Sequence, residues 1–193
     1  YQTTRPAGAA TGNGTAAPSG LEVGLGVRVA TTQRVLSQGQ MIPTGHAYDV
    51  AIEGNGYFPV TLPSGETAYT RNGAFKVSAE GLLVTGEGYP VGGEITIPTE
   101  VLNLSIAQDG RITATVPNDP APVELGQLQI TTFANPAGLE PMGKTLFRES
   151  GASGDAVTGN PGENGAGTLQ SGSLEGSNVS VVEEMIDLIS GQR

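Results

Sequence analysis

Residues 48–60 read YDVAIEGNGYFPV, and this stretch decides the fold class. Apolar and polar residues alternate over residues 48–53, which is typical of a strand that is buried on one face. The GNG triplet at 54–56 tolerates the positive φ of a tight turn, and a second apolar run follows over residues 57–60. The stretch therefore predicts two β-strands joined as a hairpin.

Short strands separated by turns continue on both sides of this stretch. Residues 21–29 alternate between apolar residues and Gly or Arg, which predicts another strand. The triplets PSG at 63–65 and RNG at 71–73 predict turns, so the strands between them are short. The clearest hairpin is predicted over residues 102–116, around a central Asp-Gly pair, and one more strand over residues 127–133, QLQITTF.

The composition supports the same fold class. The chain has 193 residues, with 30 Gly and 13 Pro, only 15% charged and 5% aromatic residues, and no Trp. Such a composition favours many short strands and tight turns over a helical bundle. We therefore predict a mainly β fold, an irregular multi-stranded β domain of short strands and hairpins, with long extended segments and one short C-terminal helix.

Four segments are predicted along the chain. Residues 1–20 are rich in Thr, Ala, Gly and Pro without periodicity, and we expect an extended, mobile segment there. Residues 21–149 form the predicted β-rich core domain. Residues 150–177 are Gly-rich and predict an extended linker that is ordered by its contacts. Residues 178–193 are expected to begin an assembly helix that the end of the chain at Arg193 cuts short.

The helix predicted over residues 178–189 carries one apolar stripe. Its apolar residues recur at spacings of three and four, and Ser180 with Glu183 fits a capping box at the helix start. A helix of about 12 residues is marginal in water, so the stripe needs a partner, either the β core of this chain or something beyond it. The stripe consists of Val179, Val182, Met185, Ile186 and Ile189.

Charge and composition exclude several classes of partner. The formal net charge is −10, from 19 acidic residues against 9 Lys and Arg, so no broad basic surface is available for nucleic acid or anionic lipid. The absence of Cys excludes a disulfide framework and a thiolate metal site. No apolar run reaches about 18 residues, so we predict no membrane insertion.

Residues 138–145, GLEPMGKT, match the phosphate-binding loop pattern of nucleotide sites. Such a loop lies at the start of a helix, whose backbone N–H groups wrap the phosphates. The sequence after Thr145 is too short and too Gly-rich to form a helix, and Pro141 lacks the N–H that the loop requires. We therefore expect an ordinary surface turn and no cofactor.

The remaining candidates for catalysis are few. Asp49 and Glu53 lie four residues apart on a predicted strand and share a face, as a glycosidase acid pair would, although such pairs are more often a polar strand face. His46 is the only histidine, and no nucleophile motif accompanies it. We therefore predict no catalytic, cofactor-binding or metal-binding residue, and a protein that is not an enzyme.

Seven short motifs are spread along the chain. They are QG at 38–39, TG at 44–45, DVAIEGNGYF at 49–58, YTR at 69–71 followed by Gly73 and Phe75, GLLV at 81–84, FANPAGLE at 133–140, and GSLEGSNV at 172–179. Together they resemble the axial proteins of the bacterial flagellum, the rod and hook family, over nearly the whole chain. Residues 1–34 look most like the distal rod branch of that family. Thr145 departs from the pattern, since the family more often has Asn there.

The resemblance implies a structural subunit that polymerises helically into a rigid drive shaft and transmits torque from the motor to the hook. It implies contacts with further copies of the chain, with other rod and hook proteins, and with ring proteins that act as bushings. It places the protein in the basal-body rod that spans the periplasm, after export by the flagellar secretion apparatus. It also implies terminal helices that extend beyond residues 1 and 193, so that the apolar stripe packs between subunits.

Three alternatives stay open at this point. A proximal rod or hook subunit of the same family is separated from the distal rod only by residues 1–34. A carbohydrate- or cell-wall-binding β module needs a surface of aromatic rings, but the chain has only five Tyr and four Phe, of which Tyr57, Phe58 and Phe75 are expected in the core. A glycoside hydrolase would use Asp49 and Glu53.

Overall fold

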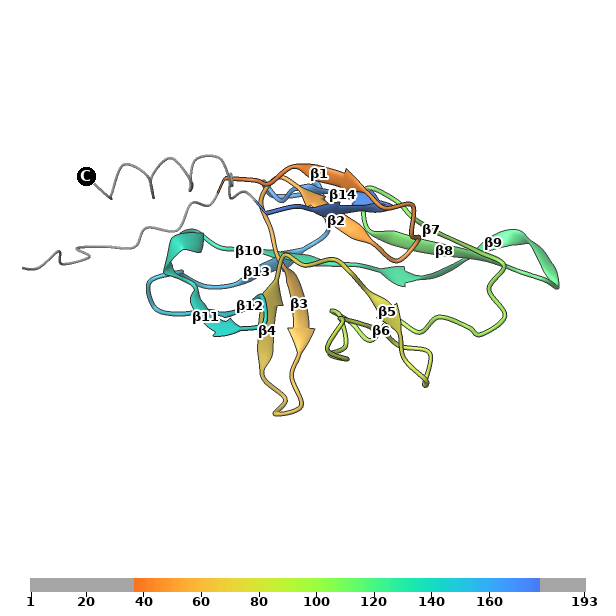
Figure 1. The fold of residues 1–193 in the computed structure, drawn as a ribbon, viewed down its shortest axis with the longest axis horizontal. Helices are drawn as coiled ribbons and strands as arrows, with labels where there is room; N and C mark the ends of the chain where they lie inside the picture. Colours follow the sequence, from red (N-terminus) through yellow and green to blue (C-terminus); the bar gives the residue numbers. More distant parts are fainter. Residues whose placement is uncertain (1–36, 178–193) are drawn as a thin grey trace, which may run out of the picture. The chain divides into compact units, whose positions relative to one another are not determined.

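Strand pairing in this protein joins segments that are far apart in the sequence. The computed structural model describes residues 37–177. Strand β1 (Met41–Pro43) pairs antiparallel with β15 (Ser173–Glu175), and β2 (Val50–Glu53) pairs antiparallel with β14 (Thr168–Ser171). The first two strands of the described range therefore pair with the last two, as Figure 1 shows at the top of the view.

The hairpin predicted from residues 48–60 is wrong in its pairing. Strand β3 (Phe58–Thr61) leaves the GNG turn and pairs with β4 (Thr67–Thr70), while β2 pairs only with β14. Three consecutive residues at the start of each strand, 50–52 and 58–60, are buried, so both faces of each strand are covered. Local alternation suggested one buried face, but neighbours distant in sequence cover the second face and take over the pairing.

One predicted turn and one predicted hairpin are confirmed. The PSG turn joins β3 to β4, and this pair extends into a four-stranded sheet with β12 (Leu146–Arg148) and β11 (Glu140–Gly143). Strands β7 (Asn103–Ile106) and β8 (Arg111–Val116) form the hairpin around the Asp-Gly pair. Strand β9 (Asp119–Gln127) completes a three-stranded sheet beside β8.

The single strand predicted over residues 127–133 is divided in two. Gln127 ends β9, and β10 (Ile130–Thr132) pairs with β13 (Val157–Gly159) in a different sheet. The break lies at Leu128, which is fully buried and whose backbone N–H donates to the carbonyl oxygen of Gly110 at 2.8 Å. A change of hydrogen-bonding partner at this residue ends one strand before the next begins.

Residues 150–177, predicted as an extended linker, contain strands β13, β14 and β15. One apolar residue anchors the segment, because Leu169 pairs with Ile52 and is buried in the core. The Gly-rich composition gave no indication of this pairing, because the partner strand lies about a hundred residues earlier in the chain. The helix predicted over 178–189 and the strand predicted over 21–29 lie outside the described residues.

The core lies between the small sheets, and the predicted core residues Tyr57, Phe58 and Phe75 are all buried. Phe58 and Phe75 meet edge to face with ring centroids 4.9 Å apart. Strands β5 (Lys76–Val77) and β6 (Leu83–Val84) and a 3-10 turn, η1 (Pro136–Gly138), complete the described elements. The main apolar cluster contains Val50, Ile52, Phe58, Val60, Leu83, Val91, Ile112, Leu128, Ile130 and Leu169, among others.

Residues 138–145, which match the phosphate-binding loop pattern, contain β11 and the turn of a β-hairpin. Gly143 pairs with Leu146, so Lys144 and Thr145 form a two-residue turn, with φ of 52° and 64°. Positive φ at both turn residues defines a type I′ turn, which favours Asn and Gly. A β-branched residue in this conformation is strained.

We predict that Thr145→Gly or Thr145→Asn raises the free energy of unfolding by about 1 kcal/mol, because each relieves the strain of a β-branched residue at positive φ. Urea unfolding monitored by circular dichroism measures the change. Thr113→Gly is the control, since Thr113 lies inside β8, where a glycine lowers stability. A loss of stability in the Thr145 variants would contradict this account of the turn.

Gly73 lies where the chain passes directly against β2. A Cβ added there would overlap the carbonyl oxygen of Val50, and the Val50 N–H donates to the Gly73 carbonyl oxygen at 3.0 Å. We predict that Gly73→Ala lowers the free energy of unfolding by about 3 kcal/mol or more, since backbone atoms must shift. Gly65→Ala, with no atom within 4 Å of the added Cβ and a φ of 84°, is expected to cost only about 1 kcal/mol. Equal losses in urea unfolding would show that the close approach is unimportant.

Candidate functional site

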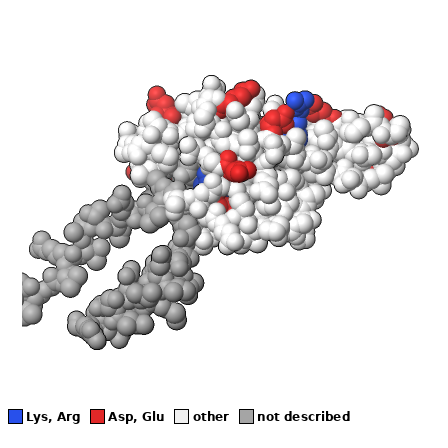
Figure 2. Space-filling model, turned by 90° about the horizontal axis from the view of Figure 1, so that it is seen from above, with Lys and Arg blue, Asp and Glu red and all other residues white. Residues whose placement is uncertain are grey.

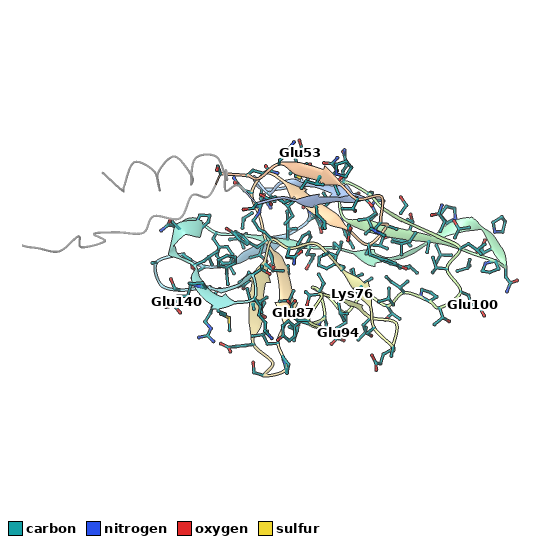
Figure 3. The ribbon with its side chains drawn as sticks, viewed as in Figure 1. Glu53, Lys76, Glu87, Glu94, Glu100 and Glu140 are labelled. Atoms are coloured by element: carbon teal, nitrogen blue, oxygen red, sulfur yellow. The ribbon has the colours of Figure 1, made fainter. Side chains whose placement is uncertain are left out.

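The structure does not bring the predicted acid pair into a cleft. Asp49 is half-buried, and its carboxylate accepts a hydrogen bond from the Thr44 hydroxyl at 2.6 Å. Glu53 is exposed at the end of β2, at the edge of the molecule in Figure 3. Neither residue lines the groove described below. Asp49 therefore has a structural partner, and Glu53 faces solvent.

The other predicted candidates are parts of turns. His46 is exposed, and its backbone carbonyl oxygen accepts from the Asp49 N–H at 3.1 Å. Residues 138–145 run from η1 through β11 into the hairpin turn, with no helix start at which phosphates would bind. No group of three or more His, Asp or Glu within residues 37–177 is placed to hold a metal ion.

Acidic side chains outnumber basic ones within residues 37–177. Acidic side chains are scattered singly over the face shown in Figure 2, with few basic ones. Every aromatic residue within residues 37–177 is buried or half-buried. In the same part of the chain, no helix has the length and apolar character needed to cross a membrane.

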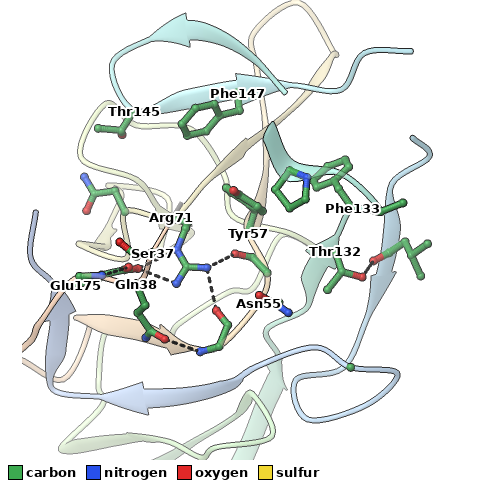
Figure 4. A pocket seen from close by; sticks show the side chains of 18 of the residues that line it. Ser37, Gln38, Asn55, Tyr57, Arg71, Thr132, Phe133, Thr145, Phe147 and Glu175 are labelled. Carbon is green, nitrogen blue, oxygen red and sulfur yellow. Dashed lines mark hydrogen bonds and ion pairs between the residues drawn. The ribbon is translucent and has the colours of Figure 1, made fainter. Parts of the chain in front are cut away.

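A groove lies where the two ends of the described range meet, and sequence reasoning did not predict it. Its lining combines the start of the range at 37–39, the GNG turn at 54–56, the end of the range at 175–177, and aromatic rings from β12 and the residues around β10. Figure 4 shows these side chains around Arg71, which follows β4. The groove therefore includes segments from both ends of the described range.

The Arg71 guanidinium binds three backbone carbonyl oxygens of the GNG turn region. Nη1 donates to Gly54 at 3.0 Å and to Gly56 at 2.9 Å, and Nη2 donates to Ile52 at 3.2 Å. Its Cζ also lies 5.8 Å from the centroid of the Tyr57 ring. Five N–H donors in a rigid plane suit this arrangement, which a lysine ammonium could not reproduce.

The same guanidinium holds the C-terminal end of the range through Glu175. Arg71 Nε and Nη2 each lie 2.8 Å from Glu175 Oε2, and the two side chains are 25% and 14% exposed. Glu175 Oε1 accepts from the Gly39 N–H at 2.9 Å. One carboxylate therefore ties the N-terminal end of the range, the C-terminal end and the turn after β4 together.

Gln38 provides a second clamp on the N-terminal side. Its Nε2 donates to the Ile52 carbonyl oxygen at 2.9 Å, and its Oε1 accepts from the Gly54 N–H at 3.1 Å. The Gly176 N–H then donates to the Gln40 carbonyl oxygen at 2.8 Å. Both ends of the described range are consequently fixed to the β2 region by side-chain and backbone hydrogen bonds. We call Gln38, Arg71 and Glu175 the junction cluster.

Four aromatic rings pack together at the groove, and three of them, Tyr57, Phe133 and Phe147, line it. Tyr57 meets Phe133 and Phe147 edge to face, with ring centroids 5.8 Å apart in both pairs, and Tyr69 meets Phe133 at 4.8 Å. Burial, together with the Glu149 carboxylate, raises the pKa of the Tyr69 phenol above its usual value. Rigid rings thus hold the position of the turn that Arg71 binds.

The sequence contained the members of the junction cluster but no signal that joins them. Arg71 and Glu175 are separated by 104 positions. Arg71 begins a predicted turn, and Glu175 belongs to the motif at 172–179, so neither pattern indicated a contact between them. The pairing of β1 with β15 places residues 39–41 beside Glu175, and the Arg71 guanidinium reaches the same carboxylate from the end of β4. The predicted packing residues Val179, Val182, Met185, Ile186 and Ile189 lie outside the described residues, so their role stays a prediction.

Two protein-family patterns match this chain. The family described as flagellar hook protein FlgE/F/G D1 domain matches residues 51–114. The family described as flagellar basal body rod FlgEFG protein C-terminal matches residues 170–193. The first match includes Arg71 and the second includes Glu175, so the junction cluster joins the two matched regions.

Individual relatives match along the full length of the chain. A flagellar basal-body rod protein FlgG from Buchnera aphidicola subsp. Acyrthosiphon pisum is 46% identical over 193 residues. The FlgG proteins of Borreliella burgdorferi and Agrobacterium fabrum are each 43% identical, over 195 and 194 residues. All three alignments cover 100% of this chain and 74% of the relative.

We predict that Arg71→Ala lowers the free energy of unfolding by about 2 kcal/mol or more, because three carbonyl oxygens and a largely buried carboxylate lose their partner. Arg71→Lys is expected to recover only part of the loss, since an ammonium cannot bind the turn and Glu175 together. Urea unfolding measures both changes.

Arg148→Ala is the matched control for this prediction. Arg148 pairs with Glu66 at 3.3 Å, but the two side chains are 45% and 54% exposed, so the loss is expected to stay below about 0.5 kcal/mol. If Arg71→Ala were as mild as Arg148→Ala, the junction cluster would not stabilise the domain.

Proposed function

The chain belongs to the flagellar basal-body rod protein family, and from this premise we propose that it is a subunit of the distal rod that polymerises helically into a rigid drive shaft. In this proposal, the rod transmits torque from the motor to the hook. The β domain forms the outer part of the shaft, and segments beyond its two ends form the inner part. Catalysis has no place in this function, which consists of packing.

The junction cluster is the observation that supports this function best. A shaft of inner and outer parts transmits torque only if each outer domain is rigidly connected to its inner segments. Here the two ends of the described range lie side by side, and Arg71 binds both the end at Glu175 and the turn after β2. A double connection of this kind resists rotation of the domain better than a single covalent link.

The inner part is assigned to the predicted terminal helix. Its stripe of Val179, Val182, Met185, Ile186 and Ile189 is proposed to pack against helices of neighbouring subunits and against a helix that precedes residue 1. Each contact is weak, but a helical polymer repeats it along the whole shaft. This assignment gives the stripe the partner that a short helix requires.

The proposed partners follow from the place of the rod in the flagellum. They are further copies of the chain, the other rod and hook proteins, and the ring proteins through which the rod passes in the periplasm. Export by the flagellar secretion apparatus fits a chain that must reach the tip of a growing shaft. A proximal rod or hook subunit is the second candidate, and residues 1–34 favour the distal rod because they resemble that branch.

Assembly is tested with the full-length protein that contains this chain. We expect concentration-dependent filaments in electron micrographs and in sedimentation, and we expect Val182→Glu and Met185→Glu to abolish them, because a charge in the stripe cannot be buried in a helix contact. Glu184→Gln is the control, since Glu184 lies on the opposite side of the predicted helix.

The thermal unfolding of the β domain is measured in each variant and is expected to stay unchanged. Filaments that persist in both stripe variants would contradict the inner packing. A full-length protein that stays monomeric at high concentration would contradict the polymer itself.

A further inference from the structure

Two exposed surfaces of the described domain have complementary properties. The first is the outer end of the β7–β8–β9 sheet, and the second is the tip of the β11–β12 hairpin. In Figure 1 the sheet extends to the right of the view, whereas the hairpin tip lies beside the end of β4, because Leu146 pairs with Thr70. Figure 3 labels Glu100, near the sheet, and Glu140, at the start of β11. We call them the sheet end and the hairpin tip.

The sheet end exposes apolar side chains beside acidic ones. Leu102 is 69% exposed and Val123 is 38% exposed. They flank the outer part of β8, since the Leu102 N–H donates to the Thr115 carbonyl oxygen at 2.8 Å and Val123 pairs with Ala114. Three exposed carboxylates, Glu100, Asp119 and Glu124, lie within a few residues of these apolar side chains along the chain.

The sheet end does not offer a backbone edge for another strand. Strand β9 carries Pro120 and Pro122, which both lack a backbone N–H, and its pairing with β8 is irregular between Val123 and Asp119. Prolines on an exposed edge prevent strand addition. A partner at the sheet end must therefore bind through side chains.

The hairpin tip carries a lysine and an apolar side chain, and the exposed Glu140 lies at the other end of β11. Met142 is 37% exposed, and Lys144 is exposed at the first position of the turn. Lys144 forms no ion pair with any residue in the range 37–177. A flexible methionine beside a lysine can adapt to an apolar surface that is bordered by carboxylates.

Charge decides which pairing of copies is favourable. Two sheet ends facing each other would oppose three carboxylates to three, which is repulsive. A hairpin tip against a sheet end brings Met142 to Leu102 and Val123, and Lys144 to the carboxylates. Because the two surfaces are different, this contact is head to tail and leaves a free surface on each copy, so that a helical arrangement of subunits continues it along the shaft.

We propose that the hairpin tip of one copy docks on the sheet end of the next copy, with Met142 against the apolar pair and Lys144 beside Glu100. The inference rests on the proposed polymer and names the contact between its outer domains. The contact is weak in isolation and becomes significant when the subunits are aligned in the shaft.

Cross-linking tests this contact, because the chain contains no cysteine of its own. Leu102→Cys and Met142→Cys are made in separate full-length chains, which are mixed, allowed to assemble and treated with a short bismaleimide. Val77→Cys replaces Met142→Cys in the control mixture, since Val77 is also 37% exposed but lies in β5. Gel electrophoresis measures the yield of the mixed dimer.

We expect a mixed-dimer yield from Leu102→Cys and Met142→Cys well above that of the control mixture. Adding Glu100→Lys to the Leu102→Cys chain should lower the yield about threefold, since an attraction becomes a repulsion. Adding Lys144→Glu to the Met142→Cys chain should then restore it. Restoration by the double reversal identifies Glu100 and Lys144 as partners, and a merely structural effect of either change would not be reversed.

The outcomes separate this inference from the proposed function. If filaments form but the yield equals that of the Val77→Cys control, the docking contact is wrong and the polymer stands. If the yield is high but insensitive to both charge reversals, the assigned pairing of Lys144 with Glu100 is wrong. If no filaments form and no cross-link exceeds the control, the proposed polymer fails together with its contact.

Discussion

The ion pair between Arg71 and Glu175 determines how the ends of this domain are arranged. Its carboxylate also accepts from the Gly39 N–H, and its guanidinium also binds carbonyl oxygens at 54 and 56. Four segments that are distant in sequence therefore share one site. The pairing of β1 with β15 brings residues 39 and 175 together, and the Arg71 side chain then links them to the turn at 54–56. Because the pair is largely shielded from water, it depends on complete hydrogen bonding rather than on charge attraction alone.

The surrounding structure explains why the ion pair can form. The backbone at Gly73 passes so close to Val50 that no side chain fits, and this brings the end of β4 against β2. Edge-to-face contacts of Tyr57 with Phe133 and Phe147 hold the far side of the GNG turn. The turn therefore presents its carbonyl oxygens in a fixed arrangement, which a planar guanidinium matches.

Local patterns predicted the fold class and the local hairpins, but not the pairing between distant strands. The Asp-Gly hairpin over β7 and β8 and the PSG turn between β3 and β4 depend on neighbouring residues, and both were predicted. The pairing of β2 with β14 depends on Leu169, a single apolar residue in a glycine-rich segment. Arg71 and Glu175 were visible only as members of separate short motifs, since no local signal relates residues 104 positions apart. Resemblance between whole motifs supplied the function that periodicity and composition could not.

The antiparallel pairing of β1 with β15 has a mechanical consequence. The chain enters at Gln40 and leaves at Gly176, on the same side of the pair, and Met41 opposite Glu175 is the first rung of the ladder. A force that pulls the two ends apart loads the residue pairs of this ladder one after another, so each pair must resist the full force alone. A force that moves both ends together is shared by all the rungs. The Arg71 guanidinium binds Glu175 in the first residue pair of the ladder. The domain therefore withstands a force that turns both ends together much better than a force that separates them.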